Sequence, residues 1–459
     1  MSDAYTSVHV DFNSKTGTLR HALHSDGHTP NLASRFARAP QDQDFLRMNF
    51  YAARTHDWAL SNAGQRIVDT HFIFPLMHLD PADPQNYYFE ATDAIIKLCH
   101  NVGMKVFYRL GTSIEHSAGK TPDDYCNHYN THPPKDNAKY AEVLAGIVRH
   151  YTRKWANGFE YKDMLYWEIW NEPDVKGKMW CGTDEEFIEF FVTVLKRLKA
   201  EFPELKIGGP ALTTLKLDYF AALLDACDAA GVKPDFISWH RYSCNVQEMV
   251  EMPFIARKFL DERNLQDVEL CINEWHYLPG SWDGVQATAS FQQRMRVLNG
   301  PCGMHGIDSG CFNLCTMCGW QDSPLDSAFY YGHGFNTWSY YDEYNRPSKN
   351  YYSMEMFGRY LAEAKEKVKA EYDKNGTVYA SAAFANNGKD GKMVISDYRG
   401  SKMTLEVDVS GMEDAEVYAT VLDNDNDIVP AQLQWDGKHL SLVKPTPGSA
   451  AFYVTFTRR

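Results

Sequence analysis

The chain has 459 residues, of which 44% are hydrophobic and 23% charged, so it can bury a large core and is neither disordered nor fibrous. It carries 60 acidic and 46 basic residues, a formal net charge of −14 that argues against nucleic acid as a partner. There is no basic tract to suggest binding to an anionic membrane, and no apolar run reaches the roughly 18 residues of a membrane span.

The N-terminus and the cysteine content favour a cytoplasmic protein. The first residues, MSDAYTSVHV, contain no basic region followed by an apolar core, so we expect no signal peptide, although a signal already removed would leave the same pattern. The 10 cysteines are too sparse for a disulfide scaffold, and we expect reduced thiols. The oligomeric state is not readable from the sequence, and a homo-oligomer stays open.

Short apolar runs alternate with amphipathic stretches from about residue 20 to residue 361. Eight runs predict strands, near residues 19–25, 67–76, 104–111, 164–173, 205–212, 235–243, 268–277 and 309–315. Helices are predicted to begin near residues 91, 138, 183, 218, 246 and 287, and Thr183 with Glu186 forms a capping box. Most strand runs are apolar on both faces, as in parallel strands covered on both sides. No glycine-rich dinucleotide turn follows the first strand, which favours a closed barrel over a doubly wound sheet.

The pattern changes after a helix predicted to end near Ala370. Apolar and polar residues then alternate between Gly, Asn and Asp turns, which indicates antiparallel strands. We therefore predict an α/β protein, a (β/α)₈ TIM barrel over residues 16–365 with a smaller C-terminal antiparallel β-sandwich over residues 366–459. The N-terminal strand in residues 1–15 alternates in the same way, and we expect it to join the sandwich.

Two glutamates stand at predicted ends of barrel strands, where the active sites of such barrels are built. Glu172 lies in WEIWNEPD, between tryptophans and a proline, and a carboxyl group against indole rings tends to keep its proton. Glu274 lies in CINEWHY, after apolar residues. Cleavage of a glycosidic bond needs two such carboxyl groups, because one protonates the leaving oxygen and the other meets the developing oxocarbenium ion.

Five segments match a known family in chain order: DTHF at 69–72, WNEPD at 170–174, IGGP at 207–210, DFISWHRY at 235–242 and NEW at 273–275. With these motifs the sequence resembles glycoside hydrolase family 39, the family of β-xylosidases and α-L-iduronidases within clan A of the retaining glycosidases. The likeness covers roughly residues 20–360, with a sandwich appended as in that family.

The resemblance implies roles for the site residues. Glu172 would be the general acid/base and Glu274 the nucleophile. The other implied residues are Asn171 at the sugar 2-hydroxyl, Tyr242 as a hydrogen-bond donor to Glu274, and His71 and His240 at the −1 subsite. Separately, Trp320, just past the predicted eighth strand, is a candidate platform for a sugar ring, although core packing explains such a ring equally well.

Two other patterns suggest metal sites and are disfavoured. Three cysteines have the spacing of a radical SAM iron–sulfur motif, but that motif normally follows the first strand, so we expect these residues to pack around the eighth strand as small apolar groups. They are Cys311, Cys315 and Cys318. Three histidines lie in a segment that Gly27 and Pro30 prevent from forming a helix, and we expect a loop or a polar rim there. They are His21, His24 and His28.

We therefore expect a retaining glycoside hydrolase without metal or cofactor, acting on short oligosaccharides or glycosides, exo-acting and β-xylosidase-like. Same-family activities on arabinosides, galactosides, glucosides or uronides stay open. A uronide would need cations, and Arg109 and Arg241 lie near strand ends. The rivals from other classes are a non-catalytic sugar-binding protein on the same scaffold and an oxidoreductase or metal enzyme on the same barrel.

Overall fold

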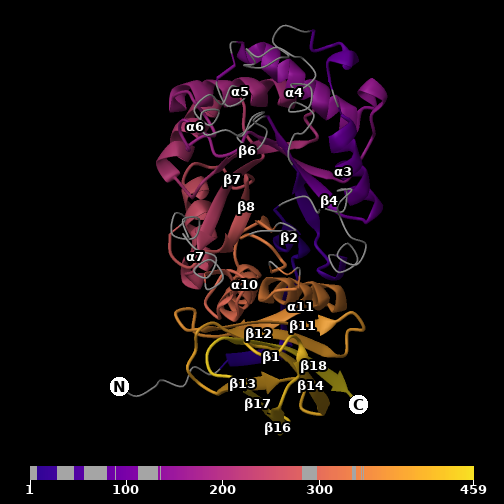
Figure 1. Ribbon diagram of the computed structural model, residues 1–459, viewed down its shortest axis with the longest axis vertical. Helices are drawn as coiled ribbons and strands as arrows, with labels where there is room; N and C mark the ends of the chain where they lie inside the picture. Colours follow the sequence, from indigo (N-terminus) through magenta and orange to yellow (C-terminus); the bar gives the residue numbers. More distant parts are fainter. Residues whose placement is uncertain are drawn as a thin grey trace.

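A closed barrel of parallel strands and a large mixed sheet make up the chain (Figure 1). This is a computed structural model, and it describes residues 8–27, 46–55, 80–87, 89–111, 133–134, 136–281, 297–332, 337–342, 344 and 346–459. The prediction of a (β/α)₈ barrel followed by a smaller β domain is confirmed.

Eight strands close the barrel in chain order, each parallel to the next. They are β2 (Ser25–Asp26), β3 (Ala52–Thr55), β4 (Lys105–Leu110), β5 (Met164–Ile169), β6 (Lys206–Leu212), β7 (Phe236–Ser243), β8 (Glu269–Tyr277) and β9 (Ser327–Tyr330). The five strands from β4 to β8 lie where the apolar runs predict them. Because the strands are parallel, their carboxyl ends all open at one mouth of the barrel.

The first, second and eighth barrel strands differ from the sequence predictions. Of the first predicted run, 19–25, only the last residue lies in a strand, β2, and His21–Leu23 forms a short 3₁₀ helix, η1. The predicted run 67–76 lies outside the described residues, and β3 holds the place between β2 and β4. Residues 309–315 are helical, within α10 (Ile307–Trp320), and the eighth strand is β9. Every residue of α10 is buried, and its polar Ser309 and Asn313 bond the buried Asn350 and Ser353, so its sequence lacks the exposed polar face that marks a surface helix.

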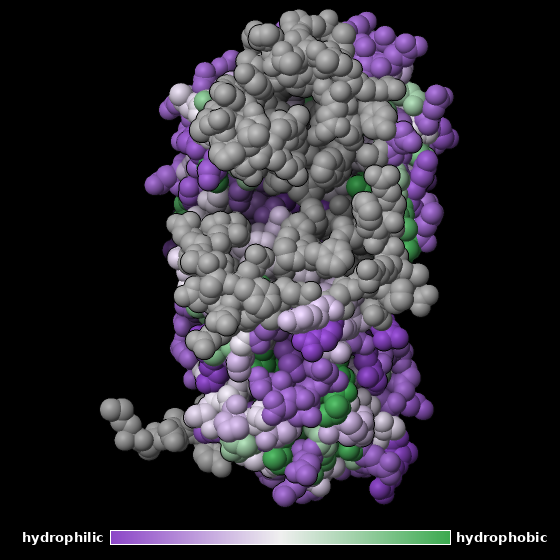
Figure 2. Space-filling view, in the orientation of Figure 1, coloured by the Kyte–Doolittle hydropathy of each residue, from purple (hydrophilic) through white to green (hydrophobic). Residues whose placement is uncertain are grey.

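Amphipathic helices surround the barrel. They are α3 (Glu90–Asn101), α4 (Asn137–Thr152), α5 (Asp184–Glu201), α6 (Leu217–Ala229) and α7 (Val246–Asp261), with short 3₁₀ helices η4 (Pro84–Asn86) and η8 (Trp155–Asn157). The predicted capping box of α5 is confirmed, because the Glu186 N–H donates to Thr183 Oγ1 and the Thr183 N–H to the Glu186 carboxylate. The helix start predicted near residue 287 lies outside the described residues. Among described side chains, those on the barrel flanks in Figure 2 are mostly hydrophilic.

The second sheet has ten strands and is mixed rather than purely antiparallel, because β1 pairs in parallel with β13 and antiparallel with β10. Its strands are β1 (Val8–Thr18), β10 (Ala364–Glu371), β11 (Val378–Ala385), β12 (Gly391–Asp397), β13 (Thr404–Ser410), β14 (Ala415–Leu422), β15 (Val429–Pro430), β16 (Leu433–Trp435), β17 (His439–Val443) and β18 (Ala450–Arg458). Helix α11 (Lys349–Glu363) ends before the predicted residue 370, because residues 364–371 pair as β10 between β1 and β11.

Helices α10 and α11 lie between the barrel and this sheet (Figure 1). The three cysteines of α10 face the β domain, not the eighth strand as predicted: the Cys315 thiol lies 3.4 Å from the Ser396 carbonyl oxygen and the Cys318 thiol 3.8 Å from that of Val394. Burial raises the pKa of the Cys311 thiol well above its usual value, so it stays protonated. None of the helices in the described ranges is long and apolar enough to cross a membrane.

Candidate active site

The backbone that carries Glu172 turns sharply as it leaves β5. Trp170 has φ +74° and Glu172 has φ +48°, both in the left-handed region that non-glycine residues rarely adopt. Such residues cost on the order of 1–3 kcal/mol each and persist where their surroundings hold them. Here the Trp170 N–H donates to the Leu110 carbonyl of β4 at 2.9 Å, and the Glu172 N–H donates to the Ala211 carbonyl of β6 at 2.9 Å. The neighbouring strands therefore hold the turn on both sides.

Asp174 ties the same loop to the loop that follows β6. Its carboxylate accepts hydrogen bonds from the Thr213 N–H at 3.2 Å and from the Thr213 hydroxyl, and it pairs with the Lys216 ammonium at 2.7 Å. The Asp174 side chain is only 4% exposed, so water screens these contacts weakly. These contacts of Asp174, two residues after Glu172, thus fix the loop that carries Glu172.

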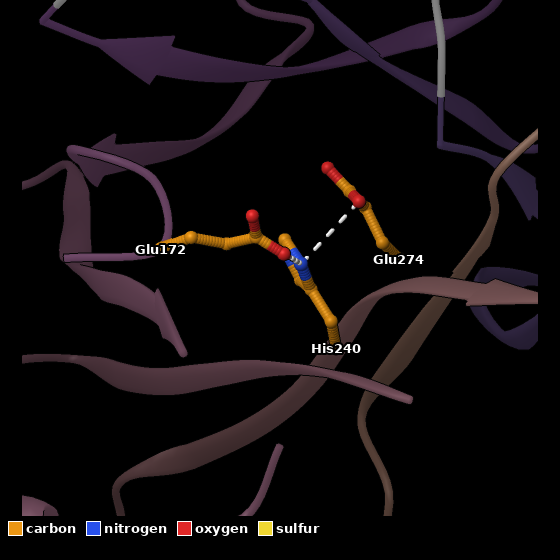
Figure 3. A group of neighbouring side chains, drawn as sticks. All are labelled: Glu172, His240 and Glu274. Carbon is orange, nitrogen blue, oxygen red and sulfur yellow. Dashed lines mark hydrogen bonds and ion pairs between the residues drawn. The ribbon is translucent and has the colours of Figure 1, made fainter. Parts of the chain in front are cut away.

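Glu172, His240 and Glu274 converge from three strand ends, with His240 between the two carboxyl groups (Figure 3). His240 Nδ1 lies 2.7 Å from Glu172 Oε1 and 3.3 Å from Glu274 Oε2. A carboxyl oxygen of Glu172 and one of Glu274 lie within 4.8 Å of each other. Two residues about a hundred positions apart in the sequence therefore face a single space at the mouth of the barrel.

Burial sets the protonation of the groups around Glu274. It lowers the pKa of His240 to about 4, so the imidazole is neutral at neutral pH. It raises the pKa of Tyr242 well above its usual value, so the phenol keeps its proton and donates to Glu274 Oε2 at 2.9 Å. Burial also raises the pKa of Glu274, an effect that the charge of Arg54 opposes. The ionised form of Glu274 depends on the donors that surround it.

Arg54, at the end of β3, joins the main parts of the site, although no motif in the sequence points to it. Its Nη1 donates to Glu274 Oε1 at 2.5 Å and its Nη2 to Asn171 Oδ1 at 2.7 Å. Its Nε and Nη2 donate to Glu168 Oε2 at 2.9 Å and 2.6 Å. The strand that bears Arg54 has only four residues, too few for a period-2 pattern to show. The signal for Glu168 was a lone charge in the apolar run MLYWEI.

The structure brings together most of the predicted site residues. Glu172, Glu274, Asn171, His240 and Tyr242 form one connected group through the contacts above. His71 lies outside the described residues. Arg109 is buried on β4, and Arg241 turns away from this group to pair with Glu248.

Trp320 lies apart from this group, which corrects its prediction as a sugar platform. Its side chain is fully buried at the end of α10, and its indole N–H donates to the Met249 carbonyl of α7 at 2.7 Å. The edge of its ring packs against Trp275 at a centroid distance of 5.0 Å. A ring covered on all sides offers no face to a sugar. Trp338 packs beside Tyr242 of the site, with ring centroids 5.1 Å apart.

The N-terminal histidines bind the backbone. His21 Nε2 lies 2.6 Å from the Asn49 carbonyl oxygen and His24 Nε2 lies 2.7 Å from that of Met48, while His28 lies outside the described residues. Within the described part of the chain, the one group with metal-ligand spacing is Glu172, His240 and Glu274. One oxygen of that group, on Glu274, already pairs with Arg54. The expectation of no metal or cofactor stays a prediction.

The fold and the site define a (β/α)₈ barrel protein with two facing carboxyl groups at the carboxyl ends of its strands. The model of the family "Glycosyl hydrolases family 39" matches residues 11–297, and the chain belongs to this family. The resemblance inferred from the motifs is thereby confirmed.

Individual relatives agree with the family assignment. A curated β-xylosidase from Caldicellulosiruptor saccharolyticus is 26% identical over 267 residues, which are 53% of this chain and 52% of that protein, so the match spans about half its length. A solved glucosidase from Croceicoccus marinus superposes with a TM-score of 0.75 at 19% identity, covering 100% of both chains. A solved family 39 β-xylosidase from Caulobacter crescentus superposes with a TM-score of 0.69 at 14% identity, covering 98% of this chain and 99% of that one. At such identities the two structures show a common fold.

Proposed function

We propose that the protein is a retaining glycoside hydrolase in which Glu274 is the nucleophile and Glu172 the general acid/base. The observation that carries the proposal is the approach of the two carboxyl groups, in which one oxygen of Glu172 lies within 4.8 Å of one oxygen of Glu274. Retaining enzymes place the two carboxyl groups about 5–5.5 Å apart, whereas inverting enzymes leave about 6.5–9.5 Å for a water molecule. Membership of the family supports the same reaction.

The contacts of the two glutamates suit these different roles. Glu274 accepts from Arg54 and Tyr242, two donors that favour its ionised, nucleophilic form and fix its orientation. Glu172 contacts the neutral imidazole of His240 at 2.7 Å, a partner that can donate to its carboxylate or accept from its carboxylic acid. The tautomer of His240 therefore sets which protonation state of Glu172 this contact favours.

The reaction then proceeds in two displacements. A Glu274 oxygen bonds to the anomeric carbon as the bond to the leaving oxygen breaks, and the Glu172 proton passes to that oxygen. Bond formation removes the negative charge of Glu274, which allows Glu172 to remain ionised. The Glu172 carboxylate then takes a proton from water, whose oxygen bonds to the anomeric carbon and releases Glu274. The product keeps the anomeric configuration of the substrate.

We propose short β-xylosides as substrates, with exo-action. The support is the family and the β-xylosidase relatives. Arabinosides, galactosides, glucosides and uronides are the same-family alternatives, and a panel of aryl glycosides that varies the sugar and its configuration separates them. The alternative hypothesis is a non-catalytic sugar-binding protein. Such a protein would bind the sugar without releasing the aryl group. The cytoplasmic location and the oligomeric state stay predictions.

The test of the two roles uses Glu172→Ala and Glu274→Gln. On an alkyl xyloside, Glu172→Ala loses about 10²- to 10⁴-fold in kcat/KM, the usual contribution of a general acid. On a dinitrophenyl xyloside, whose leaving group needs no proton, kcat/KM stays near that of the unsubstituted protein, and azide restores turnover as a β-glycosyl azide. Glu274→Gln loses on the order of 10⁴-fold or more on both substrates.

The matched control is Glu201→Gln on the outer helix α5, where Glu201 pairs with Arg149 far from the mouth of the barrel. It should keep full activity on both substrates. Equal losses on the two substrates in Glu172→Ala would contradict its role as acid. A product of inverted configuration, followed by NMR during turnover, would exclude the retaining mechanism.

A further inference from the structure

Glu168 is a fully buried carboxylate inside the barrel, on β5 and four residues before Glu172, which follows that strand. A charge without water costs several kcal/mol unless partners compensate it. The neighbours of Glu168 along the strand are the apolar residues Trp167 and Ile169. A carboxylate at this position therefore needs a reason beyond packing, and its contacts supply one.

Three other strands donate hydrogen bonds to Glu168. Arg54 of β3 donates twice to Oε2, at 2.9 Å and 2.6 Å. Ser238 of β7 donates to Oε1 at 2.5 Å, and Asn273 of β8 donates to the same oxygen at 2.6 Å. The four bonds use the acceptor capacity of the carboxylate and hold it in one orientation.

Each of these contacts leads to a residue of the proposed site. Arg54 also bonds Glu274 and Asn171, so its guanidinium lies between Glu168 and the proposed nucleophile. Asn273 immediately precedes Glu274 on β8.

The third contact leads to the proposed acid/base. Ser238 Oγ accepts from the Ala211 N–H at 2.9 Å, and the Ala211 carbonyl accepts from the Glu172 N–H at 2.9 Å. Glu168 Oε1, the oxygen that Arg54 does not contact, is thus linked through Ser238 and Ala211 to the left-handed turn that carries Glu172.

We infer that Glu168 is a positioning residue for both catalytic glutamates: through Arg54 it orients Glu274, and through Ser238 and the backbone of Ala211 it supports the turn that presents Glu172. This inference rests on the proposed function. Glu168 acts through other residues, because it lies beneath the reacting groups and is fully buried.

The charge of Glu168 has a separate effect on the site. The negative charge of Glu168 partly neutralises the positive charge of Arg54, which also pairs with Glu274. The attraction between Arg54 and Glu274 is therefore weaker than that of an Arg54 without Glu168. Among the described residues, the other charged or titratable groups that act on Glu274 are Arg109 on β4, Glu172 after β5, and His240 and Tyr242 on β7. Removal of the negative charge favours the ionised forms of both Glu274 and Glu172. Both limbs of the pH profile then move to lower pH.

The substitution Glu168→Gln removes the charge and nearly keeps the shape. The amide oxygen can still accept from Arg54, and the amide nitrogen then faces Ser238 and Asn273. Asn273 Oδ1 is buried and has no hydrogen-bond partner in the described part of the chain, so a turn of the Asn273 amide lets it accept from the new donor. The variant is therefore expected to fold.

The experiment measures kcat/KM against pH for Glu168→Gln on a dinitrophenyl and an alkyl β-xyloside. We expect a loss of about 10- to 100-fold in kcat at the optimum, the effect of a small misplacement of reacting groups. We also expect both limbs to move to lower pH by on the order of one pH unit, as the loss of a nearby like charge requires.

Two further variants separate charge from shape and from stability. Glu168→Asp keeps the charge but shortens the side chain, so both limbs of its pH profile should stay in place while kcat falls. Asp308→Asn removes a buried carboxylate that pairs with Arg399 at 2.7 Å at the interface with the β domain. It is expected to lower Tm without moving either limb.

The outcomes distinguish this inference from the proposed function. Turnover by the unsubstituted protein, together with unmoved limbs and near-normal kcat in folded Glu168→Gln, overturns the role of Glu168 and leaves the proposed function standing. If Glu168→Gln does not fold, loss of kcat in folded Glu168→Asp supports the positioning role, and full activity overturns it. A lack of turnover by the unsubstituted protein on every aryl glycoside overturns both.

Discussion

The hydrogen bond from Tyr242 to Glu274 permits a prediction whose size and sign follow from the structure. The phenol donates to Glu274 Oε2 at 2.9 Å, and its pKa is raised so far by burial that it stays a donor across the accessible pH range. Tyr242→Phe removes this donor and keeps the ring that packs against Trp338. The perturbation is therefore confined to one oxygen atom.

The expected magnitude follows from the charge on the acceptor. A hydrogen bond to a charged group contributes about 1.5–3 kcal/mol. The bond favours the ionised carboxylate, so its loss raises the pKa of Glu274, which burial already raises. Because one pKa unit corresponds to about 1.4 kcal/mol, the rise is about 1 to 2 units. The acidic limb of kcat/KM should move to higher pH by that amount.

The assay is kcat/KM against pH on a dinitrophenyl β-xyloside, where the profile reports the free enzyme. The matched control is Tyr166→Phe, because Tyr166 also donates to a glutamate, Glu269, at 2.8 Å, but at the amino ends of β5 and β8. The control should leave the acidic limb in place. An acidic limb in Tyr242→Phe that stays put, or moves to lower pH, would refute the reasoning. The direction is opposite to that expected for Glu168→Gln.

Two predictions concern stability. Lys444→Met leaves the Asp397 carboxylate buried without the ammonium that pairs with it at 2.8 Å, so urea unfolding should show a loss of about 3–5 kcal/mol; a loss below about 1 kcal/mol would contradict the role of the pair. Burial lowers the pKa of His24 to about 3, below the usual 6.5, so the unfolded chain binds the extra proton and stability falls as pH drops from about 6.5 towards 3. Tm should therefore depend less on pH in His24→Asn, and an unchanged slope would contradict this.

The parts of the fold that the sequence predicts are those with a local pattern. Strands β4 to β8 carry apolar runs long enough to recognise, and the capping box of α5 places the start of that helix within the chain. The two-residue β2 and the four-residue β3 are too short for any period to show. Residues 364–371, AKEKVKAE, suit a helix locally, but they pair with β1 and β11 as a strand. Tertiary pairing overrides local propensity there.

The candidate site divides in the same way. Glu172 and Glu274 could be found because aromatic residues and recognisable motifs flank them at strand ends. Arg54 could not, since no motif surrounds it and its partners lie 114 and 220 positions away in the chain. The prediction for Trp320 is wrong because residues 309–315, predicted as a strand, belong to the helix that carries Trp320 into the core.

The amino-acid sequence by itself determined the chemical groups available, their place at strand ends and the family of the chain. The closure of the barrel decided the rest, because it is closure that brings a carboxyl oxygen of Glu172 within 4.8 Å of one of Glu274 and buries Glu168 beneath them. Burial then sets which groups hold protons, since the cost of a charge depends on the water and the partners around it. Those surroundings come from strands far apart in the chain, and no local stretch of sequence contains them.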